Sequence, residues 1–346
     1  MGISKHTSSL HNQKELTVTE ADPADSASEM RAGTRALSLL AVPLNGTLLQ
    51  QLSEGPKRLA ELRVASGSAP PSTLRAHIKG LEEVGVVVKR GREGSLGVVE
   101  CVLTDAGEDL LVVLAAVESW LQRMPGEPAA LSDDVGKAAM KALVGGWSST
   151  VVHTLAAGPL SLSELASGIR TVSYPSVERR LAAMRLAGQV VACTGDGRGT
   201  PYEVTEWLQR GVTPMAAAVR WEYCHLPDST TSMTRIDTEA AFQLALPLLR
   251  MSSKVNGSCL MGVEIDSEEG RLAGAIAQVS AGRVDSCSVS LTEAADASAI
   301  GSSPAWGRAL IGDEDGDDRL NFSGRRRLAE ALIASLGEQL FRQTLR

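Results

Sequence analysis

The sequence predicts a mainly α-helical chain: two similar helical units, each with a β-hairpin, followed by an α+β domain with an antiparallel sheet. One observation is a stretch that occurs twice, as EGPKRLAEL at 54–62 and as AGPLSLSEL at 157–165. A second is that the same succession of helical and β-type patterns surrounds each copy. A third is a change of composition after Pro227, where three β-type runs follow. The 346 residues are enough for two or three domains.

Charge and composition limit the class of protein. The formal net charge is -7, and the acidic excess lies in the two tails, whereas the repeated units are close to neutral. This excludes a protein coated in basic charge, but a local basic face is compatible with an acidic total. Residues 1–33 are polar, lack the apolar core of a signal peptide and predict a disordered leader.

Cysteine and histidine usage argues against metal chemistry and disulfides. The five cysteines form no CxxC pair, which fits free thiols in a reducing cytoplasm. The histidines are scattered, so we expect no metal site and no cofactor. No apolar run reaches the roughly 20 residues of a membrane span, so we expect a cytoplasmic protein without a membrane partner.

The first unit, residues 34–124, is a series of short amphipathic segments. We predict two helices over 34–53 with a break at 43–46, a short helix over 57–63, a helix over 72–84 capped by Ser72 or Thr73, and a long closing helix over 104–121 capped by Thr104. β-type runs at 86–90 and 98–104 predict a hairpin. Leu74, Ile78 and Leu81, spaced by four and three, are expected to face the core.

This order, three helices followed by a hairpin and a closing helix, is the winged helix-turn-helix pattern. Its third helix normally enters the major groove, and its hairpin wing touches the backbone or the minor groove. The second unit, residues 132–227, repeats the order at an offset of 103 that falls to 101 in a shorter wing. There Thr205 matches Thr104 as the cap, and Trp221 matches Trp120 near the end of the closing helix.

These features resemble the HxlR family of bacterial transcription regulators, which are relatives of MarR. The matching residues are the GGW, ST and GP run at 145–159, the L-x-EL that follows, the proline before the third helix, the Gly/Arg wing and the terminal Trp. The first unit departs from the pattern with Leu44 in place of Trp147. No cysteine precedes Cys101, so redox sensing through an N-terminal thiol is not expected.

The resemblance implies homodimers in which two recognition helices read a two-fold site. Two copies in one chain then predict a fused pseudo-dimer with unequal halves, and the short linker 124–132 favours this over two independent domains. A further homodimer of the whole chain is an additional possibility.

Candidate DNA contacts are polar side chains on the third helix and the wing of each unit. They are Ser72, Thr73, Arg75, His77, Lys79, Arg90 and Arg92 in the first unit, and Ser176, Arg179, Arg180 and Arg198 in the second. Arginine suits guanine, lysine suits phosphate, and hydroxyls at a helix start suit phosphate. The alternative is a solvated helix face, which the nearby Glu82, Glu83 and Glu178 support. His153 is expected to be structural.

The C-terminal part, 236–346, combines a helix at 237–251, the β-type runs 258–266, 271–280 and 283–291, and a final helix at 325–341. The AGRV turn, SPAWGRALIG and NFSGRRRLAEALIASL resemble the sterol-carrier-like domain. This resemblance implies an apolar pocket for a lipophilic small-molecule effector, and a domain used only for packing or dimerisation is the alternative. Cys259 and Cys287 are expected to be core residues.

The sequence therefore predicts a transcription regulator that binds double-stranded DNA and is not an enzyme. No Gly-rich nucleotide loop, Ser/His/Asp arrangement or paired-carboxylate motif stands out. The alternatives are a winged-helix protein that binds another protein, a lipid carrier, and an accessory module of the methyltransferase type.

Overall fold

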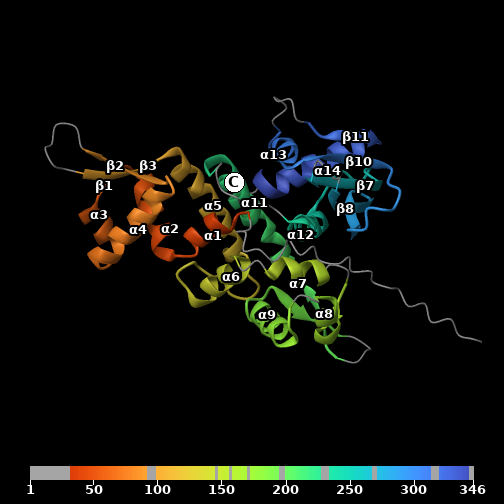
Figure 1. Ribbon diagram of the computed structural model, residues 1–346, viewed down its shortest axis with the longest axis horizontal. Helices are drawn as coiled ribbons and strands as arrows, with labels where there is room; N and C mark the ends of the chain where they lie inside the picture. Colours follow the sequence, from red (N-terminus) through yellow and green to blue (C-terminus); the bar gives the residue numbers. More distant parts are fainter. Residues whose placement is uncertain are drawn as a thin grey trace, which may run out of the picture.

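The computed structural model in Figure 1 describes residues 32–91, 99–144, 147–155, 158–169, 172–194, 199–226, 234–266, 271–312 and 319–342. Two helical parts lie against each other, and a sheet domain packs beside them. The two repeated stretches of the sequence, 54–62 and 157–165, each lie in one of the two helical parts.

The first part contains five helices and a three-stranded sheet. Its elements are α1 (Thr34–Leu40), α2 (Pro43–Ser53), β1 (Lys57–Arg58), α3 (Leu59–Ala65), α4 (Pro71–Glu83), β2 (Val87–Gly91), β3 (Val99–Leu103) and α5 (Asp105–Gln122). The sheet order is β1-β3-β2, with antiparallel pairs throughout. The two-residue β1 was not expected from the sequence, because so short a strand has no periodicity of its own.

Two helix starts differ from the sequence expectation. The break between α1 and α2 lies at Ala41 and Val42, and Pro43 is the first residue of α2. Proline suits that position because its missing N–H would have no partner there. Likewise α4 begins at Pro71 with Pro70 before it, and no side chain caps it. The prediction that Ser72 or Thr73 caps this helix is therefore wrong.

The buried face of α4 is the one predicted. Leu74, Ile78 and Leu81 are each at most 1% exposed and share a core with Leu49 and Leu62. Complete burial of one such side chain contributes about 1.5–3 kcal/mol. The apolar stripe thus fixes the rotation of α4 and turns its polar side chains outward.

The second part, 134–225, has a comparable element order. Its elements are α6 (Asp134–Val144), α7 (Trp147–Leu155), β4 (Leu160–Ser161), α8 (Leu162–Gly168), α9 (Tyr174–Leu186), β5 (Val190–Ala192), β6 (Pro201–Val204), α10 (Glu206–Arg210) and α11 (Val212–His225). The sheet order is β4-β6-β5. The expected single closing helix is two helices, because Pro214 has no N–H to bond the carbonyl of Arg210, four residues earlier.

Thr104 and Thr205 occupy the same local geometry. Thr104 Oγ1 accepts from Gly107 N at 3.3 Å and donates to Gly85 O at 2.6 Å. Thr205 Oγ1 accepts from Leu208 N at 3.2 Å and donates to Gly188 O at 2.9 Å. Each hydroxyl therefore caps its helix and ties it to the turn after the preceding helix, as the sequence predicted for the caps.

Replacing either threonine by alanine is expected to lower the free energy of unfolding by about 0.5–2 kcal/mol, because a helix cap is lost. Chemical denaturation of Thr104→Ala and Thr205→Ala checks this. Thr104→Ser and Thr205→Ser keep the hydroxyl and should recover most of the loss. A serine variant as unstable as the alanine variant would show that the methyl group, and not the cap, matters.

The C-terminal domain has a five-stranded sheet with helices packed on it. Its elements are α12 (Arg235–Ala245), a 3-10 turn (Leu246–Leu248), β7 (Gly257–Asp266), β8 (Arg271–Ser280), β9 (Arg283–Ser288), β10 (Ala297–Ser302), α13 (Ser303–Ile311), β11 (Asn321–Gly324) and α14 (Arg326–Gly337), followed by a π-helical turn (Glu338–Arg342). The order is β11-β10-β7-β8-β9.

The prediction of a purely antiparallel sheet is wrong. Strand β10 pairs with β7 in parallel, from Ala297 opposite Cys259 to Ser302 opposite Glu264. The chain leaves β9 at one edge and crosses to the free edge of β7 through residues 289–296. The expectation failed because β10 was not among the three β-type runs found in the sequence. Its residues, ASAIGS, include only one β-branched and no aromatic side chain, so they lack the composition typical of a strand.

One sheet face is rich in alanine and carries the core of this domain. Alternate residues of β7 and β10, among them Cys259, Met261 and Ala299, are fully buried with Phe242 and Trp306. The two rings meet edge to face with centroids 5.6 Å apart, and Trp306 Nε1 donates to Gly262 O at 2.7 Å. Burial raises the pKa of the Cys259 thiol to about 12, which fits the expected core role.

Helix α11 lies between the first part and the sheet domain (Figure 1). Thr213 Oγ1 donates to Gln339 O at 3.2 Å, and the Arg220 guanidinium lies 5.7 Å from the centre of the Phe341 ring. At a second contact with the sheet domain, His153 Nε2 of α7 lies 2.6 Å from the buried carboxylate of Glu239 in α12. His153 thus joins α7 to α12, which agrees with its predicted structural role. None of the helices described here is long and apolar enough to cross a membrane.

Candidate nucleic-acid interface

The exposed side of α4 carries four of the predicted contact residues. Ser72, Thr73, Arg75 and Lys79 are all exposed, because Leu74 and Ile78 hold the opposite face in the core. Ser72 and Thr73 stand in the first turn, where their hydroxyls are open to a phosphate. The structure therefore brings these four together on one surface.

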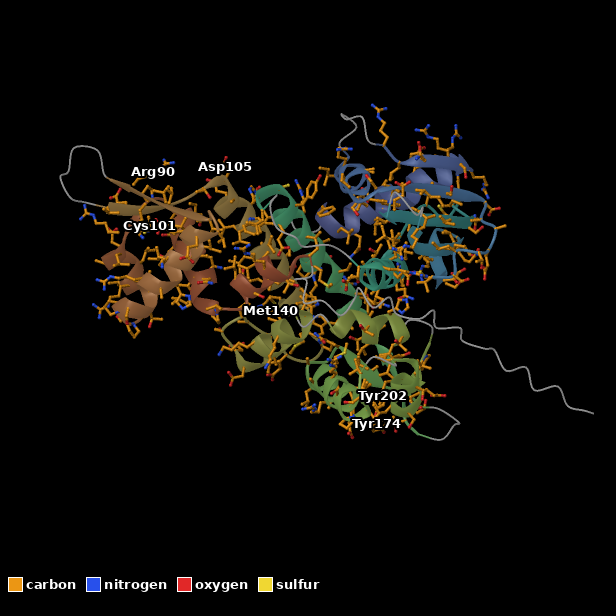
Figure 2. All side chains as sticks on the ribbon, in the orientation of Figure 1. Arg90, Cys101, Asp105, Met140, Tyr174 and Tyr202 are labelled. Atoms are coloured by element: carbon orange, nitrogen blue, oxygen red, sulfur yellow. The ribbon has the colours of Figure 1, made fainter. Side chains whose placement is uncertain are left out.

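The wing adds one cation on the side that is turned to α4, Lys89, whereas Arg90, the next residue of β2, lies on the opposite face of the hairpin. Arg90 and Lys89 lie exposed on β2, and Figure 2 shows Arg90 and Cys101 on the hairpin at one end of the molecule. Lys89 Nζ lies 2.6 Å from Glu82 Oε2, and Lys79 Nζ lies 3.4 Å from Glu83 Oε1. In the described part of the chain, Arg75 and Arg90 pair with no carboxylate. Within the same described residues, Arg75 is therefore the cation of the α4 surface without a carboxylate partner, and Arg90 is an unpaired cation on the outer face of the wing.

His77 is placed differently from its neighbours. Its Nδ1 lies 2.9 Å from Oδ1 of Asn45. Asn45 is 6% exposed, and its Nδ2 donates to Leu39 O at 2.8 Å. The ring is half-buried against α2. The contact ties α4 to the helix behind it, which favours a packing role for His77 over the predicted DNA contact.

The corresponding surface of the second part is arranged less openly. Arg179 folds back along α9, with Nε 3.3 Å from Pro175 O and a terminal nitrogen 3.4 Å from Ser176 Oγ. Ser176 also accepts from Ser173 Oγ at 3.0 Å. Arg180 is half-buried and has an interaction partner. Two of the three predicted residues on α9 are thus engaged with their own helix.

Tyr174 was not predicted as a site residue. It is the first residue of α9 and is 47% exposed, and Figure 2 shows it at the edge of the second part. An exposed ring at the start of a helix that enters the major groove would be able to contact a thymine methyl. The signal was present, because the position matches Pro71 of the first unit, where no side chain of this size stands.

Arg92 and Arg198, predicted at the two wing tips, lie outside the described residues.

The thiol of Cys101 on β3 is 4% exposed, and burial raises its pKa while Lys89 opposes that shift. A thiol in this state is poorly nucleophilic at neutral pH. Among the residues that the structure describes, no cluster of histidine, cysteine and carboxylate side chains is suited to hold a metal ion.

Comparison with known proteins supports the interpretation of the first part. No curated protein matches the chain. Residues 44–127 match the family described as HxlR-like helix-turn-helix. The match covers α2 to α5 and so includes the recognition helix and the wing. This family match identifies residues 44–127 as an HxlR-type helix-turn-helix segment and indicates a DNA-binding transcriptional regulator.

Proposed function

We propose that two HxlR-like winged helices in this chain form a pseudo-dimer that reads operator DNA, and that the chain regulates transcription without being an enzyme. The first winged helix spans residues 34–124 and the second 132–227. The proposal rests chiefly on one arrangement of tryptophans between the two parts.

The two terminal tryptophans make reciprocal hydrogen bonds. At the offset of 101, Trp221 corresponds to Trp120, and Trp207 corresponds to Ala106. Trp120 Nε1 donates to Trp207 O at 2.9 Å, and Trp221 Nε1 donates to Ala106 O at 2.7 Å. Each terminal indole therefore bonds to the same backbone position of the opposite unit. Such reciprocity is the mark of a two-fold, self-complementary interface.

The other contacts between the two units, which together with the tryptophans form the seam, support the same arrangement. Helices α5 and α11, the closing helices of the two units, pack against each other, and α1 packs on α11. Met140 of α6, labelled in Figure 2, lies in one core cluster with residues of the first unit. A core shared across the two units favours a fused pair over two independent domains.

The two halves are unequal in this proposal. The first unit offers Ser72, Thr73, Arg75, Lys79 and Arg90. The second offers Tyr174, Ser176, Arg179 and Arg180, of which Arg179 must first leave Pro175 O and Ser176 Oγ. We therefore expect an operator with two different half-sites, about one helical turn apart, and the stronger contribution from the first unit.

Selection from random duplexes, followed by fluorescence anisotropy at several salt concentrations, tests this function. Arg75→Ala is expected to weaken binding about 5- to 150-fold and to relax one half-site, as for a lost arginine to guanine contact. Lys79→Ala should weaken binding to all sequences and reduce the salt slope by about one. The matched control is Arg63→Ala, an exposed arginine on α3.

Arg179→Ala with Arg180→Ala tests the other half. A loss confined to the second half-site supports a second reading helix, whereas unchanged binding removes α9 from the interface. If no duplex is enriched at all, the proposal fails and the chain is better described as a winged-helix protein that binds another protein.

The C-terminal domain is proposed to sense a ligand or to mediate assembly. One of its contacts with the second unit is made by Glu239 of α12, which is held by His153 of α7 at 2.6 Å and by Arg235 Nε at 2.7 Å. A displacement of α12 would therefore be transmitted to α7 through the contact between Glu239 and His153. A lipophilic effector in this domain stays a prediction based on the resemblance to sterol-carrier-like domains.

A further inference from the structure

A groove separates the recognition helix of the first unit from its wing. Lys89 pairs with Cys101 and Gly91 with Val99 in the β2–β3 register, so Lys89, Cys101 and Val99 share one face of the hairpin. That face is turned to α4. Toward the core, Val87 of the hairpin and Ile78 of α4 are both buried. Beside them, α4 and the hairpin line a groove with a volume of about 440 Å³.

The floor of this groove is apolar. It is lined by Leu59, Ile78, Val99 and Cys101. Ile78 and Cys101 are buried, whereas Val99 is 52% exposed although its side chain belongs to the core-facing side of the strand. A phosphate or a deoxyribose-phosphate backbone gains little from such a floor, because its oxygens require polar partners. The lining instead suits a ligand with an apolar body.

The rim of the groove is cationic. Arg75, Lys79 and Lys89 line it, and the carboxylates of Glu83 and Glu82 pair with the two lysines. Three positive charges against two negative charges leave one positive charge, which the unpaired guanidinium of Arg75 carries. A guanidinium offers two parallel N–H donors to one carboxylate. The rim is therefore complementary to a monoanion.

We propose that this groove binds a small amphipathic anion, a carboxylate attached to an aromatic ring or to a short acyl chain. The carboxylate pairs with Arg75, and the apolar body lies on Leu59, Ile78 and Val99. The volume falls within the roughly 300–1,000 Å³ of small-molecule sites, which are mostly apolar with a few placed polar groups. The site lies on the recognition surface itself and is separate from the C-terminal domain.

Occupation of the groove has a direct regulatory consequence, which rests on the proposed function. Arg75 is also the proposed base contact of α4, so one guanidinium cannot serve both partners. The anion and the operator are therefore expected to compete. A ligand that binds only the DNA-free protein shifts the equilibrium by its differential affinity for the two states.

Isothermal titration of the full chain with 1-naphthoate tests the site without any DNA. We expect one equivalent to bind, and both inorganic phosphate and the neutral 1-naphthalenemethanol to bind at least about tenfold more weakly, since each lacks one of the two complementary features. Equal binding of phosphate would overturn the proposal, because it would reveal an ordinary anion surface.

Two variants assign the binding to the groove. Arg75→Gln should weaken 1-naphthoate about tenfold, and Val99→Thr about threefold, because the first loses the charge-assisted pair and the second part of the apolar floor. Arg63→Gln and Val64→Thr, an exposed pair on α3, are the matched controls and should bind as the parent does. Unchanged affinity in both groove variants, with circular dichroism showing intact folding, would place the ligand elsewhere.

A competition assay separates this inference from the proposed function. With the selected duplex present, 1-naphthoate should raise the apparent dissociation constant for DNA linearly with its free concentration, doubling it when that concentration equals its own dissociation constant. Binding of 1-naphthoate in a chain that selects no DNA would overturn the proposed function and leave the site standing. Tight DNA binding with no titratable 1-naphthoate would overturn the site and leave the function standing.

Discussion

Replacing Trp120 by alanine is expected to lower the free energy of unfolding by about 3–5 kcal/mol, the largest loss of any single change considered in this chain. Trp120 is 3% exposed and stacks on Trp207, with ring centroids 4.4 Å apart and planes 3° from parallel. Each indole also donates to the backbone carbonyl of the other residue, at 2.9 and 2.8 Å. The substitution therefore removes a large apolar contact and leaves the backbone carbonyl of Trp207 without its indole donor.

Chemical denaturation of Trp120→Ala, Trp207→Ala and the double variant measures this seam directly. Because the rings are in contact, the double variant should lose less than the sum of the singles, with a coupling of about 0.5–3 kcal/mol. Trp306→Ala is the control, since Trp306 is also buried but belongs to the other core cluster. It should be costly as well, yet additive with Trp120→Ala. A loss below about 1 kcal/mol for Trp120→Ala would contradict the importance of the seam.

Trp120→Phe separates packing from hydrogen bonding. It keeps an aromatic ring and loses the N–H, so part of the stability should return while the Trp207 carbonyl stays unpaired. If the seam sets the relative placement of the two recognition helices, the alanine variant should also weaken binding to a selected operator more than to either half-site alone. Equal weakening on both kinds of DNA would mean that the seam stabilises the fold without aligning the helices.

The second large effect is expected at Glu222. Its carboxylate is carried by α11 and is 2% exposed, yet it accepts from Gly33 N at 2.7 Å and from Ala36 N at 2.9 Å. These N–H groups at the start of α1 have no partner within the helix, and the helix dipole also favours a negative charge there. Gly33 itself has φ of 84° and approaches Val219 closely, which favours glycine at this position.

Glu222→Ala should lower the free energy of unfolding by about 3 kcal/mol, because two charge-assisted hydrogen bonds of about 1.5–3 kcal/mol each are lost and are not fully additive. Hydrogen exchange at the Gly33 and Ala36 amides should accelerate together. Glu222→Gln keeps one acceptor oxygen and should lose about half as much.

Glu206→Gln is the control for the change of charge. Glu206 is exposed and pairs with Arg210 on its own helix, so its loss should stay within about 0.5 kcal/mol. If Glu222→Ala proves equally mild, the contact between α1 and α11 is not what holds the first unit to the second.

Much of the fold was predictable because it follows local rules. The spacing of Leu74, Ile78 and Leu81 fixed which face of α4 is buried, and Thr104 and Thr205 marked the starts of two helices through their capping hydroxyls. The exposure of Ser72, Thr73, Arg75 and Lys79 follows from the same stripe. These features depend on residues within about one or two helical turns, whose periodicity the sequence contains.

The parts that sequence reasoning missed depend on partners far along the chain. His77 is turned toward Asn45, Arg179 folds onto its own helix, and β10 joins β7 in parallel. The matching position of Trp221 was visible, but the stacking of Trp120 on Trp207 was not, since Trp207 has only Ala106 as its counterpart.

The sequence by itself determined most helices of the two helical parts, their hairpins and the buried face of α4, because hydrophobic spacing, capping and turn residues act locally. Only the tertiary structure decided that Glu222 closes the start of α1, that the two tryptophans stack, and that a groove opens between α4 and the wing. The physical reason is that a buried charge, a ring stack or a groove is defined by what arrives from elsewhere in the chain. No local pattern encodes that arrival.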